Sequence, residues 1–321
     1  MAAVAIAASF SGCNKMEEGE FNPKQKLVEV YQETSDNESG TWQSYGNVLT
    51  EAYQWNGNVL ESISYYDGRE VASVVETFQY DEKNRIIGST MTENGFVVNT
   101  LTTKYVYDDD ELEEINIFEN GTLISSYEFE HEDGKIVELQ VRYVNNMKVA
   151  CTKALQYADP LRRIMPQQVA KEVNRIMAKA ATKGEDGYAI NFEWDGNNVS
   201  VLSTSFSDGS IKVTYKYDNK LNPYFGLFTM YSIESNMAGS GISLFSKNNP
   251  VEMSATTTMD TTIDSYSVNF NYQYEGKYPI SSTLESPVVS YDYQYNEATG
   301  EYEVVETEYQ QRVVTTYVYA K

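Results

Sequence analysis

Hydrophobic and polar residues alternate along most of the chain, and short turn signals interrupt the alternation at regular intervals. Segments such as Leu60–Tyr65 and Ile211–Tyr215 interleave apolar and polar side chains, as β-strands with one buried face do. Asn, Asp and Gly, which suit tight hairpin turns, separate these segments. The pattern predicts repeats of two strands, each strand about 8 to 10 residues long. The turn signals include Asn56-Gly57, Asp67-Gly68, Asn94-Gly95, Asn120-Gly121, Asp133-Gly134, Asp195-Gly196, Asp208-Gly209 and Glu275-Gly276.

A pair of aromatic residues precedes one turn of each repeat, at intervals of 22 to 27 residues within the first run of four pairs and 23 residues between Phe192 and Tyr215. Consecutive hairpins lie side by side in space, so the repeats predict an all-β fold: an extended antiparallel meander with aromatic side chains on one face. A flat single layer would leave that face in water, so the sheet is expected to curl into a half-barrel or an open sandwich. The pairs are Tyr53/Trp55, Phe78/Tyr80, Tyr105/Tyr107, Tyr127/Phe129, Phe192/Trp194, Tyr215/Tyr217 and Tyr272/Tyr274.

One basic segment, residues 153–183, departs from this pattern. It carries seven Lys and Arg residues against two acidic ones. Pro166 suits a first helical turn, apolar residues follow at helical spacing, and Gly184 suits a helix end. We therefore predict one inserted helix near 166–183 that packs on the sheet or caps one end of it. A flexible linker between two halves is the alternative.

The N-terminal residues resemble the leader of a bacterial lipoprotein. Ala2–Phe10 is an apolar stretch of signal-peptide length, and Phe10-Ser11-Gly12-Cys13 resembles a lipobox. This resemblance implies a signal peptide over 1–12, cleavage before Cys13 and acylation of that cysteine, because several acyl chains give a stable membrane anchor. A buried cysteine in an N-terminal strand is the alternative. Residues 13–25 form a tether that resembles the surface-export tether of Bacteroidetes lipoproteins; a solvated linker is the other interpretation.

The repeats themselves also resemble known families. Tyr-x-Tyr-Asp followed by Asn or Gly is similar to the YD repeats of RHS-type wall and toxin-shell proteins. Four segments between residues 50 and 285 stand in the order found in Bacteroidetes lipoproteins of the DUF4595 type, a domain of unknown function. That resemblance implies a β-repeat architecture and brings no catalytic residues. The segments are Phe192–Asn197, Tyr215–Pro223, Lys247–Pro250 and Tyr272–Pro279.

These features divide the chain into consecutive parts of one continuous domain. After the signal peptide and the tether come a first β-repeat half (26–152), the basic insertion (153–187) and a second β-repeat half (188–321). The net charge of -23 argues against nucleic acid or an anionic membrane face as the main partner.

Residues that commonly carry catalysis or hold cofactors are scarce. The chain has one histidine, His131, and two cysteines, so it cannot form a multi-histidine zinc site. The sequence also contains no G-x-S-x-G hydrolase elbow. We expect no cofactor and no internal disulfide. The acidic run Asp108, Asp109 and Asp110 is a weak candidate for a hard cation, against a solvated turn.

Exposed aromatic side chains are the remaining candidates for ligand binding, because flat rings stack on sugars. Packing in the core is the alternative for each of them. The loop after Asn222 attracts notice because Pro223 donates no ladder hydrogen bond, so a regular hairpin falters there. The candidate ligand-binding residues are Trp42, Trp55, Trp194, Tyr224 and Phe225.

Together these features favour a non-enzymatic cell-envelope lipoprotein. Its partners would be outer-membrane lipid, through acylated Cys13, and a glycan or envelope protein that its β-repeat surface binds or scaffolds. The expected location is the outer membrane, exposed at the cell surface or else facing the periplasm. One alternative is a glycan-acting hydrolase that uses two carboxylates. Another is a periplasmic carrier of an apolar ligand.

Overall fold

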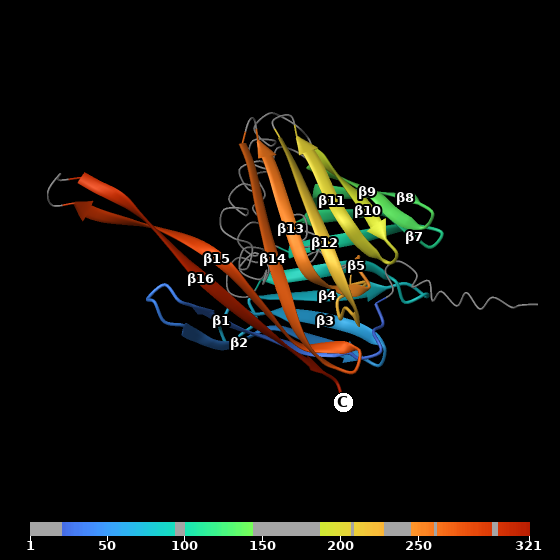
Figure 1. Ribbon diagram of the computed structural model, residues 1–321. Helices are drawn as coiled ribbons and strands as arrows, with labels where there is room; N and C mark the ends of the chain where they lie inside the picture. The colour runs from blue at the N-terminus through green and yellow to red at the C-terminus, as the bar shows by residue number, and fades with distance from the viewer. Residues whose placement is uncertain are drawn as a thin grey trace, which may run out of the picture.

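The computed structural model describes residues 21–93, 100–143, 187–206, 209–227, 245–259, 262–296 and 301–321, and its regular elements there are sixteen β-strands. Figure 1 shows them as one continuous wall around a common interior. The strands are β1 (Leu27–Asp36), β2 (Gln43–Asn56), β3 (Val59–Tyr65), β4 (Val74–Tyr80), β5 (Ile86–Glu93), β6 (Thr100–Asp108), β7 (Glu111–Glu119), β8 (Thr122–Glu132), β9 (Lys135–Tyr143), β10 (Gly187–Asp195), β11 (Asn198–Phe206), β12 (Gly209–Leu221), β13 (Asn248–Met259), β14 (Thr262–Glu275), β15 (Tyr278–Asn296) and β16 (Glu301–Tyr319).

The sheet is a closed antiparallel barrel. Each strand pairs with the next along the chain, β9 pairs with β10 across the two predicted halves, and β1 pairs with β16 from Leu27–Tyr319 to Asp36–Gln311. The expectation of an open meander, a half-barrel or an open sandwich is therefore wrong. Closure hides the apolar face and leaves no sheet edge where the first and last strands meet. The helix expected near 166–183 lies outside the described residues.

The tight turns follow the sequence signals. Asn120 and Gly121 both have positive φ (49° and 81°), and so do Asp133 and Gly134 (52° and 69°). This backbone belongs to two-residue hairpin turns whose twist matches that of the strands. The hairpin turns predicted at these two dipeptides are confirmed.

The even-numbered strands from β2 to β14 all end at the same end of the barrel, which we call the turn rim. Each hairpin at the turn rim contains a β-bulge. The bulge lies at or next to the second aromatic of the pair, and bulges bend a strand and increase its twist. In the fourth hairpin His131 takes this position, so the repeating pair is Phe129/His131 and the predicted pair Tyr127/Phe129 is wrong by two residues. The register shifts fall at Gln54/Trp55, Gln79/Tyr80, Val106/Tyr107, Glu130/His131, Glu193/Trp194, Lys216/Tyr217 and Gln273/Tyr274.

The second aromatic of a repeat also donates a hydrogen bond to a backbone carbonyl on the neighbouring hairpin. The ring packs on the core while its polar atom satisfies an oxygen that the bulged ladder leaves free. Five such bonds measure 2.6–2.7 Å: Trp55 Nε1 to Leu27 O, Tyr80 to Leu60 O, Tyr107 to Ile86 O, Trp194 Nε1 to Ile136 O and Tyr217 to Val199 O.

A basic side chain lies over the ring of three of these aromatics and over that of Tyr274, the second aromatic of the last repeat. Each cation lies 4.4–5.7 Å from the ring centroid and donates to the carbonyl of the residue two positions after the aromatic. Cation–π attraction and a charged hydrogen bond thus tie adjacent hairpins together. We call this arrangement the clasp. Its members are Lys26/Trp55/Gly57, Arg85/Tyr107/Asp109, Lys135/Trp194/Gly196 and Lys220/Tyr274/Gly276.

The apolar core lies inside the barrel, and most exposed side chains of the described wall are polar; Ile87, Val106, Ile263 and Ile280 are exposed apolar exceptions. β14 illustrates the division: Val268 is 2% exposed and Phe270 packs against the core, whereas Ser265, Ser267 and Asn269 are exposed. Elsewhere the outer face carries cross-strand ion pairs such as Lys216–Glu252 (2.9 Å).

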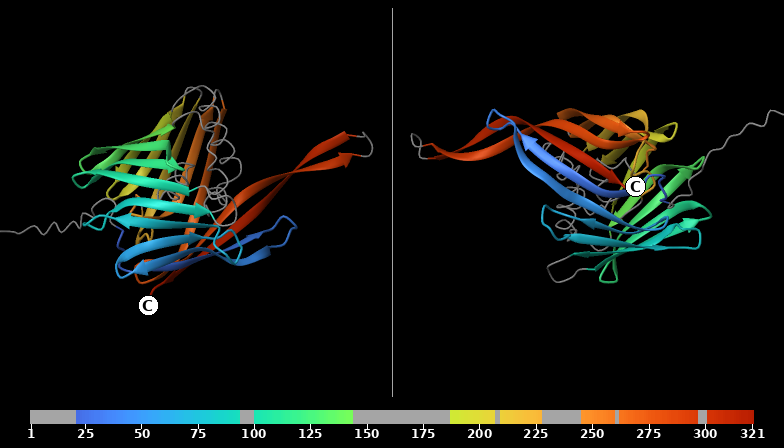
Figure 2. Two further views of the ribbon diagram at one scale, coloured as in Figure 1. Left: turned by 180° about the vertical axis from the view of Figure 1, so that it is seen from behind. Right: turned by 90° about the horizontal axis from the view of Figure 1, so that it is seen from below.

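A long hairpin leaves the barrel at the opposite rim. Figures 1 and 2 show the outer parts of β15 and β16 projecting beyond the wall as a two-stranded ribbon, next to the hairpin of β1 and β2. The ladder between β14 and β15 ends at Leu284, and that between β1 and β16 ends at Gln311.

We predict that Tyr107→Phe destabilises the barrel. The change removes the hydrogen bond to Ile86 O (2.7 Å) and should lower the free energy of unfolding by about 1 kcal/mol. Urea denaturation measures the effect. Tyr66→Phe is the matched control, because the Tyr66 hydroxyl bonds to nothing in the described part of the chain. Equal stability of the two variants would contradict a stabilising role for the hydrogen bond from Tyr107 to Ile86 O.

Candidate functional site

Two glutamates lie on the inner face of the barrel among tyrosines. Glu51 on β2 is 6% exposed and Glu76 on β4 is 0% exposed. Buried carboxylates are costly unless they are hydrogen-bonded, and perturbed acids in an interior are the usual first candidates for a functional site. We call the two glutamates and the tyrosines around them the inner acidic cluster.

Glu51 accepts a hydrogen bond from a tyrosine of its own strand and acts electrostatically on a tyrosine in a loop from the other half of the barrel. The Tyr53 hydroxyl donates to its Oε2, and its charge raises the pKa of Tyr224 in the turn after β12, where burial is the larger cause. Tyr224 in turn meets Tyr317 of β16 edge to face, with centroids 6.2 Å apart. Residues far apart in sequence thus converge on one carboxylate.

Glu76 lies two strands away and shares a tyrosine with the first glutamate. Tyr65 on β3 is the cross-strand partner of Glu51, and its hydroxyl donates to Glu76 Oε2 at 3.3 Å. Burial, followed by the Glu76 charge, raises the pKa of Tyr105 far above its usual value. Tyr65 therefore links two acids on β2 and β4 into one polar cluster.

Three buried hydroxyls extend this polar region around the wall. Ser89 on β5 pairs with Thr103 on β6, and Ile117 separates Thr103 from Ser125 on β8. Each residue is at most 3% exposed. The Tyr105 hydroxyl hydrogen-bonds to Ser89, whereas the hydroxyls of Thr103 and Ser125 have no hydrogen-bond partner among the described residues. Such groups weaken a core by their desolvation.

The exposed fractions limit what the inner acidic cluster can do. Glu51 and Glu76 have at most 6% of their surface exposed, and phenols rather than solvent contact their oxygens. A carboxylate pair that cleaves glycans needs a bound sugar and water between its members, and a polymer does not reach these two acids. The sequence offered a signal for them: each glutamate precedes an inward aromatic, Tyr53 or Phe78, by two residues and so shares its face.

Two predicted ligand-binding residues belong to the clasp. Trp55 and Trp194 donate to backbone carbonyls at 2.7 Å, and Lys26 and Lys135 lie over their rings. Both rings are partly buried against the core. Trp55 and Trp194 occupy equivalent positions in the repeat, and at both positions the ring packs against the core and bonds to the neighbouring strand.

Trp42 is the exception among the tryptophans. It is 40% exposed, just before β2, and the Arg312 guanidinium lies 4.2 Å from its ring centroid. Tyr45 nearby is 63% exposed, and its hydroxyl donates to Asp36. This surface lies where β1 ends and the projecting ribbon begins.

The loop after β12 departs from the hairpin pattern, as its proline predicts. β12 ends at Leu221, and Asn222 donates its backbone N–H to Lys247 O at 3.0 Å and its side chain to Ser246 O at 2.9 Å. Tyr224 packs against the core, and Phe225 follows it in the turn. The described part of this loop turns Tyr224 inward rather than presenting it to a ligand.

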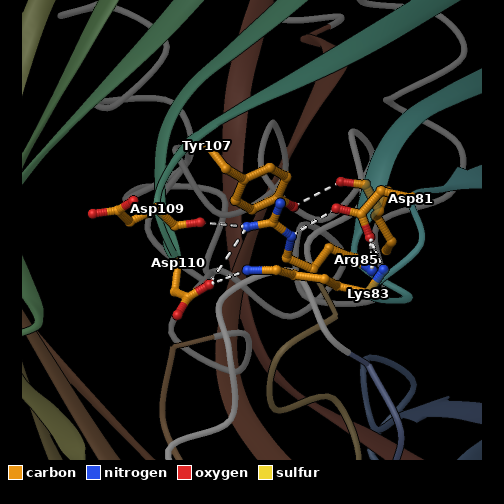
Figure 3. A network of polar contacts seen from close by, with 7 residues as sticks. Asp81, Lys83, Arg85, Tyr107, Asp109 and Asp110 are labelled. Atoms are coloured by element: carbon orange, nitrogen blue, oxygen red, sulfur yellow. Dashed lines mark hydrogen bonds and ion pairs between the residues drawn. The ribbon is translucent and has the colours of Figure 1, made fainter.

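The acidic run that suggested a cation site carries ion pairs instead (Figure 3). Asp110 contacts Lys83 Nζ at 2.7 Å, and the carbonyl of Asp109 accepts from Arg85 at 2.8 Å. Arg85 also pairs with Asp81 at 2.8 Å; burial opposes ionisation of that acid, yet hydrogen bonds from Arg85 and Lys83 leave its pKa lowered. Asp108, the third acid, ends β6. No group of three potential metal ligands occurs among the described residues.

The lipidation candidate Cys13 lies outside the described residues. The nearest described contact is that of Phe21, which is 3% exposed and stacks on Trp55 with centroids 5.6 Å apart. The chain thus joins the barrel at the turn rim. The described residues include no helix with the length and hydropathy of a membrane span.

Comparisons with known proteins give structural likenesses only. No protein-family model and no curated protein matches the chain. Among solved structures, porin-like proteins of Bacteroides uniformis and Bacteroides vulgatus match 92% of this chain and 98% and 99% of theirs, at 9% and 11% identity and TM-scores of 0.44 and 0.34. The Tc holotoxin pore of Photorhabdus luminescens matches 70% of this chain and 10% of its own, at 9% identity and a TM-score of 0.25. Likenesses this distant define neither a family nor a function.

The buried tyrosines predict a loss of stability in alkali. Burial is the main reason why the pKa of Tyr317 rises to about 12 and those of Tyr53, Tyr215 and Tyr272 rise further above 10. Above pH 10 the unfolded chain releases protons that the folded chain keeps. The free energy of unfolding should therefore fall as pH rises from about 10 towards 12, by up to about 1.4 kcal/mol per pH unit for each tyrosine.

Ultraviolet absorbance of tyrosinate, followed together with circular dichroism, measures this effect. We expect exposed phenols to ionise first and the remainder to ionise as the barrel unfolds. Ionisation of all tyrosines in one step near pH 10, with the fold intact, would contradict the inward placement of these phenols.

Proposed function

We propose that the chain is a lipid-anchored protein of the outer membrane whose barrel stands beside the bilayer and serves, without catalysis, as a binding module. The observation that carries the proposal is the polarity of the wall. Membrane-spanning barrels place an apolar band outside and polar residues inside. Here the apolar core is inside, and exposed Ser265, Ser267 and Asn269 lie on the outside of a central wall strand.

A lipid anchor supplies the membrane attachment that such a wall does not. Cys13 of the lipobox-like sequence precedes Phe21 by eight residues, and Phe21 is packed on Trp55 at the turn rim. A chain of that length reaches at most about 28 Å. Acylation of Cys13 would hold the turn rim next to the membrane and direct the opposite rim, with the projecting ribbon, away from it.

A binding role at the surface agrees with the packed interior. Glu51 and Glu76, the candidate acid pair, are buried and bonded to tyrosines, which supports neither glycan hydrolysis nor transport of an apolar ligand along the inner face. The exposed aromatic residues Trp42 and Tyr45 lie at the opposite rim, where an anchored barrel would meet a glycan or an envelope protein.

Replacement of Cys13 tests the anchor. Cys13→Ala should move the protein from the membrane to the soluble fraction, because most exposed side chains on the described part of the wall are polar. Cys151→Ala, which leaves the lipobox-like sequence intact, is the matched control and should remain in the membrane. Retention of Cys13→Ala in the membrane fraction would sink the anchoring proposal.

A charge on the outer wall tests whether that wall faces water. We expect Ser267→Lys to change the free energy of unfolding by no more than about 0.5 kcal/mol, as at other wet surfaces. The same change at the midplane of a lipid-facing wall costs about 2–4 kcal/mol. Val268→Lys, one residue along and facing inward, should cost about 3 kcal/mol or more. Chemical denaturation compares the two, and a large loss for Ser267→Lys would contradict the proposal.

A further inference from the structure

The projecting ribbon has two backbone edges that no other described strand covers. Its residues, 288–296 of β15 and 301–309 of β16, pair only with each other within the described ranges, over nine consecutive residue pairs from Val288–Tyr309 to Asn296–Glu301. β14 leaves β15 at Leu284, and β1 leaves β16 at Gln311. We call these residues the arm; Figure 2 shows it reaching well beyond the barrel wall.

A two-stranded ribbon of this kind has little stability by itself. Two isolated strands are marginally stable in water, and an uncovered edge presents unpaired N–H and C=O groups along its length, about 30 Å for nine residues. Where strands of the barrel lie side by side, each covers the edge of the next; residues 262–269 of β14 and 43–49 of β2 also extend past their β15 and β3 partners. A third strand laid along one edge would satisfy these groups by the same ladder that builds the barrel.

The charge of the arm indicates which kind of strand would bind along its edge. Residues 288–309 include six acidic residues and no Lys or Arg. Four of the acids, Glu301, Glu303, Glu306 and Glu308, belong to β16. A second copy of the arm would bring like charges opposite one another, which destabilises cross-strand pairs, whereas Lys and Arg would complement them.

The exposed aromatic surface lies at the base of the β16 edge. Asn37, directly after β1, exchanges hydrogen bonds with the backbone of Gln310. Trp42 and Tyr45 follow in the same hairpin and are 40% and 63% exposed. A guest strand that extends the β1 side of β16 would therefore begin beside two exposed rings.

We propose that the arm is a strand acceptor: its β16 edge binds an extended, Lys- or Arg-bearing segment of a partner protein by β-strand addition. The inference rests on the proposed binding role but not on lipidation. Backbone pairing supplies affinity, the acidic residues select basic side chains, and Trp42 and Tyr45 anchor one end of the guest.

Fluorescence anisotropy with the purified full chain tests the proposal. The probe is a labelled nine-residue peptide of alternating Thr and Lys. Two further probes separate backbone pairing from charge: the same peptide with every backbone amide N-methylated, which donates no ladder hydrogen bond from either edge, and a peptide with Glu in place of Lys. We expect saturable binding of the first probe and at least tenfold weaker binding of the other two.

Two variants place the binding on the arm. Replacement of residues 288–309 by Asn-Gly should weaken binding of the Thr-Lys probe at least tenfold. Changing Glu301, Glu303, Glu306 and Glu308 to Gln keeps the ribbon and should weaken it similarly. The matched control changes four exposed acids on the wall and turns, Glu82, Glu113, Glu130 and Glu132, to Gln; it removes the same charge and should bind almost as well as the unmodified chain.

Three results would overturn the inference. The first is equal binding by the arm-deleted chain and the unmodified chain. The second is equal binding of the N-methylated probe, which would mean attraction to the charge of -23 alone. The third is a concentration-dependent dimer of the unmodified chain that the arm deletion abolishes, which would make the guest a second copy. None of these results bears on the anchor, which the fractionation of Cys13→Ala tests separately.

Discussion

The need to hide one face of a single sheet governs this structure. Every described strand contributes to one layer, and the inward side chains form one continuous core of buried residues. A one-layer sheet buries such a face only by packing on another layer or by closing on itself. The pairing of β1 with β16 achieves closure, so the apolar face is enclosed and exposed polar side chains such as Ser265 and Ser267 lie on the other face.

The turn rim supplies the curvature that closure requires. Its seven hairpins each carry a bulge at or beside the second aromatic position, and each bulge adds twist and bend in the same place. The clasp then fixes neighbouring hairpins, because one cation contacts both an aromatic ring and a turn carbonyl. The repeated bulges and clasps thus together bend the sheet into a barrel. The arm extends from the opposite rim.

Much of the local structure follows from the sequence, and the closure does not. Turn dipeptides such as Asn120-Gly121 identify the hairpins, and the equivalence of Trp55 and Trp194 indicates their structural role. A strict two-residue alternation does not predict bulges, so the alternation alone does not predict how strongly the sheet curves. For the same reason it does not identify His131 as a member of the repeat. Glu51 and Glu76 share their faces with neighbouring aromatics, but convergence with Tyr224 depends on a contact between distant strands.

The water-facing wall is the central claim, and cysteine labelling tests it most directly. Asn269 is exposed on the outer face of β14. In isolated membrane fragments, a charged maleimide should modify Asn269→Cys at close to the rate of a free thiol, above the background of the unsubstituted chain. Protection that disappears only when detergent dissolves the bilayer would show that lipid covers this wall, and would contradict the account.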